Sequence, residues 1–232
     1  MTRGSFLLVV SGLRAEARIA ASAGVRALSG GGNAARLAAA INRGIGEGAN
    51  GLLSFGMAGG LEPGLAPGTI VVPGVVIAGT ERFATDPHWT RNLRGKLRGN
   101  LRPGVEGAVA GVSSPVATIA AKAGLRAATG AAAADMESHI AARAAQRFRL
   151  PLAVLRVVAD PAERALPAAA VAALGKDGRP DLWALLRSLC RDPAQLSGIL
   201  GVAADARRAM AVLADCARLL GCGFGRPGAG ER

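Results

Sequence analysis

The chain has 232 residues, of which 50% are apolar and 19% are charged. This length and apolar content suit a single globular domain, and they exclude an intrinsically disordered chain. The longest apolar stretches, such as residues 6–10, are far shorter than the ~20 residues that cross a bilayer, and no secretory signal pattern accompanies them. Cys190, Cys216 and Cys222 form no CxxC pair and no cluster with histidine, so we expect neither a disulfide framework nor a metal site.

The net charge is strongly positive. Lys+Arg 28 against Asp+Glu 16 gives +12, and only three residues are lysine, so the excess is arginine. A basic protein attracts polyanions such as nucleic acid, anionic lipid or phosphorylated small molecules. GC-rich coding also gives many arginines, which would then be dispersed on a solvated surface. Aromatic residues make up only 3% of the chain, which argues against the stacking platforms of single-strand nucleic-acid binders.

Short apolar runs alternate with helical patterns up to about residue 165, which predicts an α/β domain with a mainly parallel sheet. The expected strands are 6–10, 25–28, 51–55, 69–78, 108–112, 131–134 and 152–158. The expected helices are 15–23, 34–41, 116–127 and 136–147, with another that begins at Asp86-Pro87. A helical extension follows over about 166–220, with helices at 167–174, 181–189 and 193–219, and we expect the tail 221–232 to fray. No linker divides the chain, so 1–232 is predicted to be one domain with its core at about 5–165.

Two glycine-rich segments are candidate ligand contacts. Gly30 to Asn33 precede a helix, where backbone N–H groups can hold a phosphate, but they match no phosphate-binding motif, and a plain tight turn is the alternative. The segment Ser54-Phe55-Gly56-Met57-Ala58-Gly59-Gly60 follows a buried strand, where open α/β sheets bind ligands. We therefore expect 56–68 to be a Gly/Pro-rich binding loop.

Carboxylates occur at two further strand ends. Asp135-Met136-Glu137-Ser138 begins a helix, and acidic residues in a first helical turn are explained by capping alone. Asp160 ends an apolar strand directly before Pro161. Partial burial would raise its pKa and make it a general acid; an ordinary helix cap is the alternative. His88 and His139, the only histidines, have no ligand-spaced partners, and we expect them to be ordinary surface or core residues.

Five segments in order resemble the nucleoside phosphorylase/nucleosidase superfamily, which includes purine nucleoside phosphorylase and methylthioadenosine nucleosidase. They are Val10-Ser11-Gly12-Leu13-Arg14-Ala15-Glu16, Phe55-Gly56-Met57-Ala58-Gly59-Gly60-Leu61, Pro67-Gly68-Thr69-Ile70-Val71-Val72, Asp135-Met136-Glu137-Ser138 and Arg156-Val157-Val158-Ala159-Asp160. Within the superfamily the similarity is greatest to the hopanoid-associated phosphorylases. The resemblance implies an α/β fold with three layers, α/β/α, a central mixed sheet and a helical C-terminal extension.

The resemblance also implies an activity, cleavage of the N-glycosidic bond of adenosylhopane with release of adenine. A general purine nucleoside phosphorylase, or a methylthioadenosine/S-adenosylhomocysteine nucleosidase, is the alternative. Asp160 matches the acid that protonates the purine, Glu137 matches the carboxylate that binds the ribose hydroxyls, and Met136 matches the apolar floor beneath the ribose. The other implied substrate contacts are Asp135, Gly56, Met57, Ala58, Gly59, Ser114, Val116 and Ala117.

The identity of the nucleophile stays open at this stage. Phosphorylases of the superfamily usually have an arginine and a hydroxyl where this chain has Ser54 and Met57. A phosphate would then depend on Ser11, Gly12, Arg14 and Arg18, whereas Glu16 lies near the position of the glutamate that activates water in hydrolytic members. We expect inorganic phosphate to be the co-substrate, because Arg14 and Arg18 flank Glu16 in the sequence, and we expect no other cofactor.

The expected partners follow from substrate and charge. We expect a small or lipid-linked adenosine substrate, a homo-oligomer as is common in the family, and a cytoplasmic protein. The arginines between 91 and 102 suit peripheral contact with an anionic membrane at its inner face. A basic nucleic-acid-binding module without catalysis would use the same arginines, but the scarcity of aromatic residues makes nucleic acid an unexpected partner.

Overall fold

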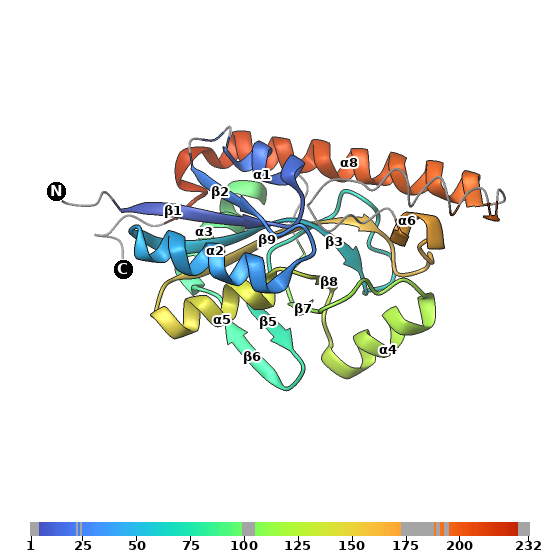
Figure 1. Ribbon diagram of the computed structural model, residues 1–232, viewed down its shortest axis with the longest axis horizontal. Helices are drawn as coiled ribbons and strands as arrows, with labels where there is room; N and C mark the ends of the chain where they lie inside the picture. Colours follow the sequence, from blue (N-terminus) through green and yellow to red (C-terminus); the bar gives the residue numbers. More distant parts are fainter. Residues whose placement is uncertain are drawn as a thin grey trace.

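A computed structural model describes residues 5–21, 23, 25–98, 105–172, 188, 191–192 and 195–226. They contain a mixed nine-stranded sheet with the strand order β2-β1-β3-β8-β7-β5-β6, while β9 pairs with β3 and with β4. The strands are β1 (Phe6–Ser11), β2 (Arg26–Ser29), β3 (Ala49–Gly60), β4 (Ile70–Val71), β5 (Val75–Ala78), β6 (Glu81–Ala84), β7 (Ala108–Gly111), β8 (Ala133–Asp135) and β9 (Leu152–Asp160). The sheet lies between two groups of helices (Figure 1).

One apolar cluster packs α2 (Ala34–Gly46) and α5 (Ser138–Phe148) against one face of the sheet. A second cluster packs α3 (Pro87–Arg98) and the long α8 (Leu196–Leu220) against the other face, where α1 (Arg14–Ala21) also lies. The remaining helices are α4 (Ile119–Thr129) and α6 (Ala168–Ala172), with a 3-10 turn at Gly221–Gly223. These layers and the C-terminal helix confirm the predicted three-layer fold. No helix among the described residues is long and apolar enough to cross a membrane.

The central strands β3 and β9 position the site. They pair in parallel from Leu52 beside Leu152 to Gly59 beside Asp160, and most of their side chains are buried on both faces. The first half of β3 also pairs with β1 in parallel, and its last two residues pair with β8 in the antiparallel direction. Strands packed on both faces need mostly apolar sequence, which residues 152–158 supply except at Arg156.

The prediction of a loop over 56–68 was wrong for its first five residues, because β3 continues through Gly60. The glycines stay extended because β9 and β8 supply the hydrogen-bonding partners of their backbone. The predicted run 69–78 is two strands, β4 and β5, separated at Pro73, which lacks the N–H that a continuous strand needs. Strand β6, an antiparallel partner of β5, was not predicted.

Helix starts were displaced by two or three residues. Helix α4 begins at Ile119 rather than at residue 116, and the Thr118 hydroxyl accepts from the Ala121 N–H. Helix α5 begins at Ser138 rather than at residue 136. The predicted start at Asp86-Pro87 is confirmed, because Asp86 Oδ1 accepts from the Trp89 N–H at 2.9 Å.

The predicted C-terminal helices are seen as α6 and α8. Residues 173–174 and most of the predicted helix 181–189 lie outside the described residues. The tail does not fray over 221–226: Phe224 is fully buried, packs edge-on against Phe55 at 5.4 Å between ring centroids, and accepts a hydrogen bond from Trp89 Nε1. Packing of Phe224 in the core keeps this glycine-rich segment in place, where fraying was predicted. Residues 227–232 lie outside the described part.

Candidate active site

The predicted site residues meet where β1, β3, β8 and β9 end. Ser11, Asp135 and Asp160 are the last residues of β1, β8 and β9, and Gly56 to Gly60 form the end of β3. Ligands of α/β sheets commonly bind at the carboxyl ends of strands. The fold therefore brings residues from four distant parts of the sequence to one place.

Arg156, on β9, is the central charge of this site and is completely buried. Its Nε lies 2.7 Å from Asp135 Oδ2. Its Nη2 donates to Ser54 Oγ at 2.5 Å and to Ser138 Oγ at 3.2 Å, and its Nη1 donates to the Met57 carbonyl at 3.4 Å. A buried guanidinium without such partners would be very costly, so these contacts fix its position.

Asp135 has two roles in the structure. Its Oδ1 accepts from the Glu137 N–H at 3.0 Å and the Ser138 N–H at 2.8 Å, which caps the start of α5. Its Oδ2 accepts from Ser138 Oγ and pairs with Arg156. The helix start is therefore oriented by the same carboxylate that neutralises the buried arginine.

Glu16 reaches the site from α1 and is held by backbone amides. Its Oε2 accepts from the Gly12 N–H at 3.0 Å and the Leu13 N–H at 2.7 Å, and its Oε1 accepts from the Met57 N–H at 2.8 Å. Burial raises the pKa of Glu16, against the opposing effect of these hydrogen bonds and of Arg156. The carboxylate is thus fixed in position and is more basic than an exposed one.

Glu137 lies next to the same arginine, with 3.6 Å between Arg156 Nη1 and Glu137 Oε2. Burial raises the pKa of Glu137 to about 8; Arg156 opposes this rise, and the neighbouring Asp135 and Glu16 add to it. Three carboxylates therefore surround one arginine. This group, Glu16, Asp135, Glu137 and Arg156, is called the arginine–carboxylate cluster below.

Two glycines make room for the cluster. A Cβ on Gly56 would lie 2.7 Å from Arg156 Nη1 and 2.9 Å from Glu16 Oε1. A Cβ on Gly12 would lie 2.8 Å from Glu137 Oε1. Real Cβ atoms do not approach other atoms so closely, so a side chain at either position would displace the charged groups of the cluster.

Asp160 forms a buried ion pair with Lys122 of α4, at 2.5 Å between Oδ2 and Nζ. The Lys122 ammonium also donates to the carbonyls of Pro161 at 2.7 Å and Arg164 at 2.9 Å, which uses all three of its N–H groups. Burial raises the pKa of Asp160, and Lys122 opposes that rise. Within the described part of the chain Oδ1 has no hydrogen bond, so it is available to a ligand, and no helix begins at Asp160 for it to cap.

The other predicted contacts lie around this centre. Met136 is half-buried and lines a small pocket with Glu137 and Ser113. Three further predicted contacts lie in the connection from β7 to α4, which is tied to the segment after Asp160 by the Leu166 N–H to Ala117 carbonyl bond at 2.8 Å. These are Ser114, Val116 and Ala117.

The four predicted phosphate residues differ in burial. Ser11 is buried, with a hydroxyl that has no hydrogen-bond partner among the described residues, and Gly12 is beside Glu137. Arg14 and Arg18, by contrast, are exposed on α1. The arginine whose charge acts on Glu16 is Arg156, so the two exposed arginines do not surround Glu16 as the sequence suggested.

The turn at Gly30 to Asn33 is explained by local structure. Gly31 and Gly32 have positive φ, and the Asn33 side chain accepts from the Arg36 N–H to cap α2. The tight-turn interpretation is confirmed. The turn also lines the small pocket beside Glu137.

Sequence reasoning missed Arg156, Ser54, Ser138 and Lys122 as site residues. Arg156 interrupts an otherwise apolar strand, and Lys122 is one of three lysines in an arginine-rich chain; both were available signals. His139, expected to be an ordinary surface or core residue, is buried; its ring lines the same small pocket as Glu137, and its Nδ1 has no hydrogen-bond partner among the described residues. Burial lowers the pKa of His139, so the ring is neutral at pH 7.

Comparison with known proteins agrees with this geometry. The phosphorylase superfamily matches residues 4–189, so the chain belongs to that superfamily. This membership confirms the predicted class of enzyme, a nucleoside phosphorylase or N-glycosyl hydrolase. A search of curated protein sequences returns no significant match.

Several solved structures share the fold. A mutant of the Helicobacter pylori nucleosidase MTAN, with 5'-methylthioadenosine in its active site, has a TM-score of 0.63 at 15% identity, covering 91% of this chain and 97% of that one. The 5'-methylthioadenosine/S-adenosylhomocysteine nucleosidase of Neisseria meningitidis, in complex with methylthio-immucillin-A, has a TM-score of 0.59 at 19% identity. The match covers 91% of this chain and 98% of that one. A mutant of Helicobacter pylori futalosine hydrolase has a TM-score of 0.57 at 16% identity, and the match covers 66% of this chain and 88% of that one.

The raised pKa of Glu137 predicts a specific dependence of stability on pH. The folded protein keeps a proton on this group up to about pH 8, whereas the unfolded chain releases it near pH 4.5. Stability from this group is therefore full below about pH 4.5 and declines as the pH rises to about 8. In urea unfolding between pH 5 and pH 9, Glu137→Gln should show a shallower decline than the wild type.

Burial also raises the pKa of Glu16 and of Asp160. Glu137→Gln should therefore remove part, and not all, of the decline in stability with pH. Glu47→Gln, on an exposed carboxylate at the end of α2, is the matched control and should follow the wild type. Parallel profiles for the wild type and Glu137→Gln would contradict the assignment.

Proposed function

We propose that the protein cleaves the N-glycosidic bond of an adenine nucleoside. The observation that carries the proposal is the presence, at one sheet edge, of a buried acid with one open oxygen, Asp160, and a separate arginine–carboxylate cluster. Breaking the bond between C1′ and N9 leaves its electron pair on the purine and positive charge on the sugar. The two groups match these two charges.

Asp160 would protonate the purine as it leaves. Its raised pKa favours the protonated form, and Lys122 keeps the acid strong enough to give the proton up. Glu137 would hold the ribose hydroxyls, and the carboxylates of Asp135 and Glu16, which outnumber the one arginine, would offset the positive charge on the sugar. Interactions that strengthen as charge develops lower the barrier.

Water is the nucleophile that the cluster favours. A phosphate dianion would meet the carboxylate of Glu16, and the charge of Arg156 is already balanced by Asp135. A water molecule there would give a proton to the Glu16 carboxylate while its oxygen bonds to C1′. The products are then adenine and a free sugar. The phosphorolytic alternative remains a prediction of the sequence, with Ser11, Gly12, Arg14 and Arg18 as its ligands.

For the group beyond the ribose we propose the hopanoid side chain of adenosylhopane, on the resemblance of the GLxxEA, SFGxAGGL and DMES segments to hopanoid-associated phosphorylases. Exposed apolar side chains in the same part of the molecule support a lipid-linked substrate. Leu196 and Leu200 are 52% and 61% exposed at the start of α8, whose Gly198 contacts Pro167, in the segment after Asp160. Methylthioadenosine and S-adenosylhomocysteine are the competing substrates.

Asp160→Asn should lower the rate of adenine release by about 10²- to 10⁴-fold, because the amide cannot deliver a proton. The measurement is chromatography of adenosine, methylthioadenosine and an adenosyl-lipid after incubation with purified protein. Asp215→Asn, on the solvent-facing side of α8, is the control and should keep the wild-type rate. Near-normal release by Asp160→Asn would exclude this mechanism, and no release from any substrate by the wild type would exclude the function.

The nucleophile has its own test. Adenine release should continue at the same rate without phosphate, and phosphorus NMR of a reaction with phosphate should show no sugar 1-phosphate. Glu16→Gln should slow release by about 10²-fold, since the amide cannot accept the proton of water. Release that requires phosphate and yields a sugar 1-phosphate would replace hydrolysis with phosphorolysis.

A further inference from the structure

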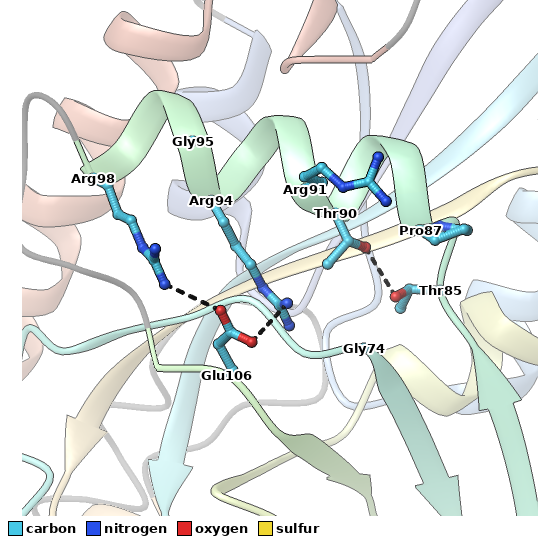
Figure 2. Close-up of a pocket in the computed structure, with 9 residues that line it drawn as sticks. All are labelled: Gly74, Thr85, Pro87, Thr90, Arg91, Arg94, Gly95, Arg98 and Glu106. Carbon is cyan, nitrogen blue, oxygen red and sulfur yellow. Dashed lines mark hydrogen bonds and ion pairs between the residues drawn. The ribbon is translucent and has the colours of Figure 1, made fainter. Parts of the chain in front are cut away.

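A second cavity, of about 410 Å³, lies beside α3 (Figure 2). Three arginines of α3, Arg91, Arg94 and Arg98, line it together with Glu106, which precedes β7. None of the residues proposed for the reaction lines it. We call it the α3 groove.

The charges of the α3 groove do not balance. Glu106 is its one carboxylate, and it pairs with Arg94 Nη1 at 3.0 Å and with Arg98 Nη2 at 3.2 Å. Three arginines against one glutamate leave an excess of two positive charges. The guanidinium groups of Arg94 and Arg98 both point to the Glu106 carboxylate (Figure 2). The groove therefore already presents N–H donors to one oxyanion, that carboxylate.

Part of the groove is held rigidly. Arg94 also donates to the Val72 carbonyl, at 2.8 Å from Nη2 and 3.1 Å from Nε. The hydroxyls of Thr85 and Thr90 lie 2.9 Å apart, and Thr85 donates to the Pro73 carbonyl at 3.1 Å. These hydroxyls bond to each other and to the backbone, so they fix the start of α3 and leave ligand contacts to the arginines.

The donors of Arg91 are unused. It is exposed, and in the described part of the chain it has neither a hydrogen bond nor an ion pair. Arg98 is 62% exposed, with one carboxylate contact. A guanidinium has five N–H donors and binds phosphate oxygens in pairs, so both arginines can accept a further anion without breaking an existing bond.

We propose that the α3 groove binds a phosphoryl group, carried by a small molecule or by a lipid headgroup. Two negative charges and three oxygens match the excess charge and the open donors better than a single carboxylate, which Glu106 already supplies. The proposal does not depend on the proposed function, because the groove and the reaction site share no residue.

The test is titration calorimetry of the full chain with inorganic phosphate. The double variant Arg91→Ala/Arg98→Ala should bind phosphate at least about tenfold more weakly than the wild type. Glu106→Gln should bind it more tightly, because a competing carboxylate is gone. Arg43→Ala/Arg207→Ala, which removes the same charge from exposed positions on α2 and α8, should bind like the wild type. The Arg91→Ala/Arg98→Ala variant should release adenine at the wild-type rate.

Sedimentation with phosphatidylcholine vesicles, with and without phosphatidic acid, distinguishes the source of the phosphoryl group. If the protein binds free phosphate through Arg91 and Arg98 but does not sediment with the vesicles, the ligand is a phosphorylated small molecule. Co-sedimentation that needs both phosphatidic acid and the two arginines assigns a headgroup. The proposal is overturned if Arg91→Ala/Arg98→Ala equals the wild type in phosphate titration and in vesicle binding.

Discussion

The burial of one guanidinium organises the end of the sheet. Arg156 has no contact with solvent, and a charge in that position must be neutralised and hydrogen-bonded or the fold is lost. The guanidinium pairs with the Asp135 carboxylate on β8 and donates hydrogen bonds to Ser54 on β3 and Ser138 on α5. Each of these belongs to a different element, so satisfying one arginine fixes how three elements meet.

The same constraint sets the chemistry of the neighbouring groups. Glu16 and Glu137 are buried beside Arg156, and burial raises the pKa of both while the arginine opposes the rise. Burial therefore favours the protonated form of both carboxylates, and Arg156 favours their charged form. Asp160 has an equivalent arrangement with Lys122, in which burial and a cation oppose each other. The site therefore has two separate carboxylate–cation groups.

Local patterns predicted most strands, the α/β class and the strand ends where the site lies, and the family resemblance implied the three layers. They failed where partners distant in the sequence decide the outcome. Gly56 to Gly60 suggest a loop, yet β8 and β9 keep them extended. Burial of Phe224 and hydrogen bonds to Trp89 and Asn50 keep the glycine-rich tail on the core. Arg156 and Lys122 could not be matched with Asp135 and Asp160 from sequence, because only the fold brings them together.

The arginines that give the chain its positive charge lie in different environments in the structure. Arg156 is buried and structural, Arg14 and Arg18 are exposed on α1, and the arginines of α3 line a groove away from the reaction site. Composition alone predicted polyanion partners in general, without separating nucleic acid, anionic lipid and phosphorylated small molecules. The positions of these arginines separate the charge that builds the site from the charge that faces solvent.

The organising role of Arg156 is tested most directly by the rate of adenine release in Arg156→Lys, with folding checked by near-UV circular dichroism. Lysine keeps the positive charge and loses the planar fork that reaches Asp135, Ser54 and Ser138 together. If Arg156 organises the site, the variant should fold and release adenine about 10²-fold more slowly, as expected for misplaced reacting groups. A folded variant with the wild-type rate would contradict this role.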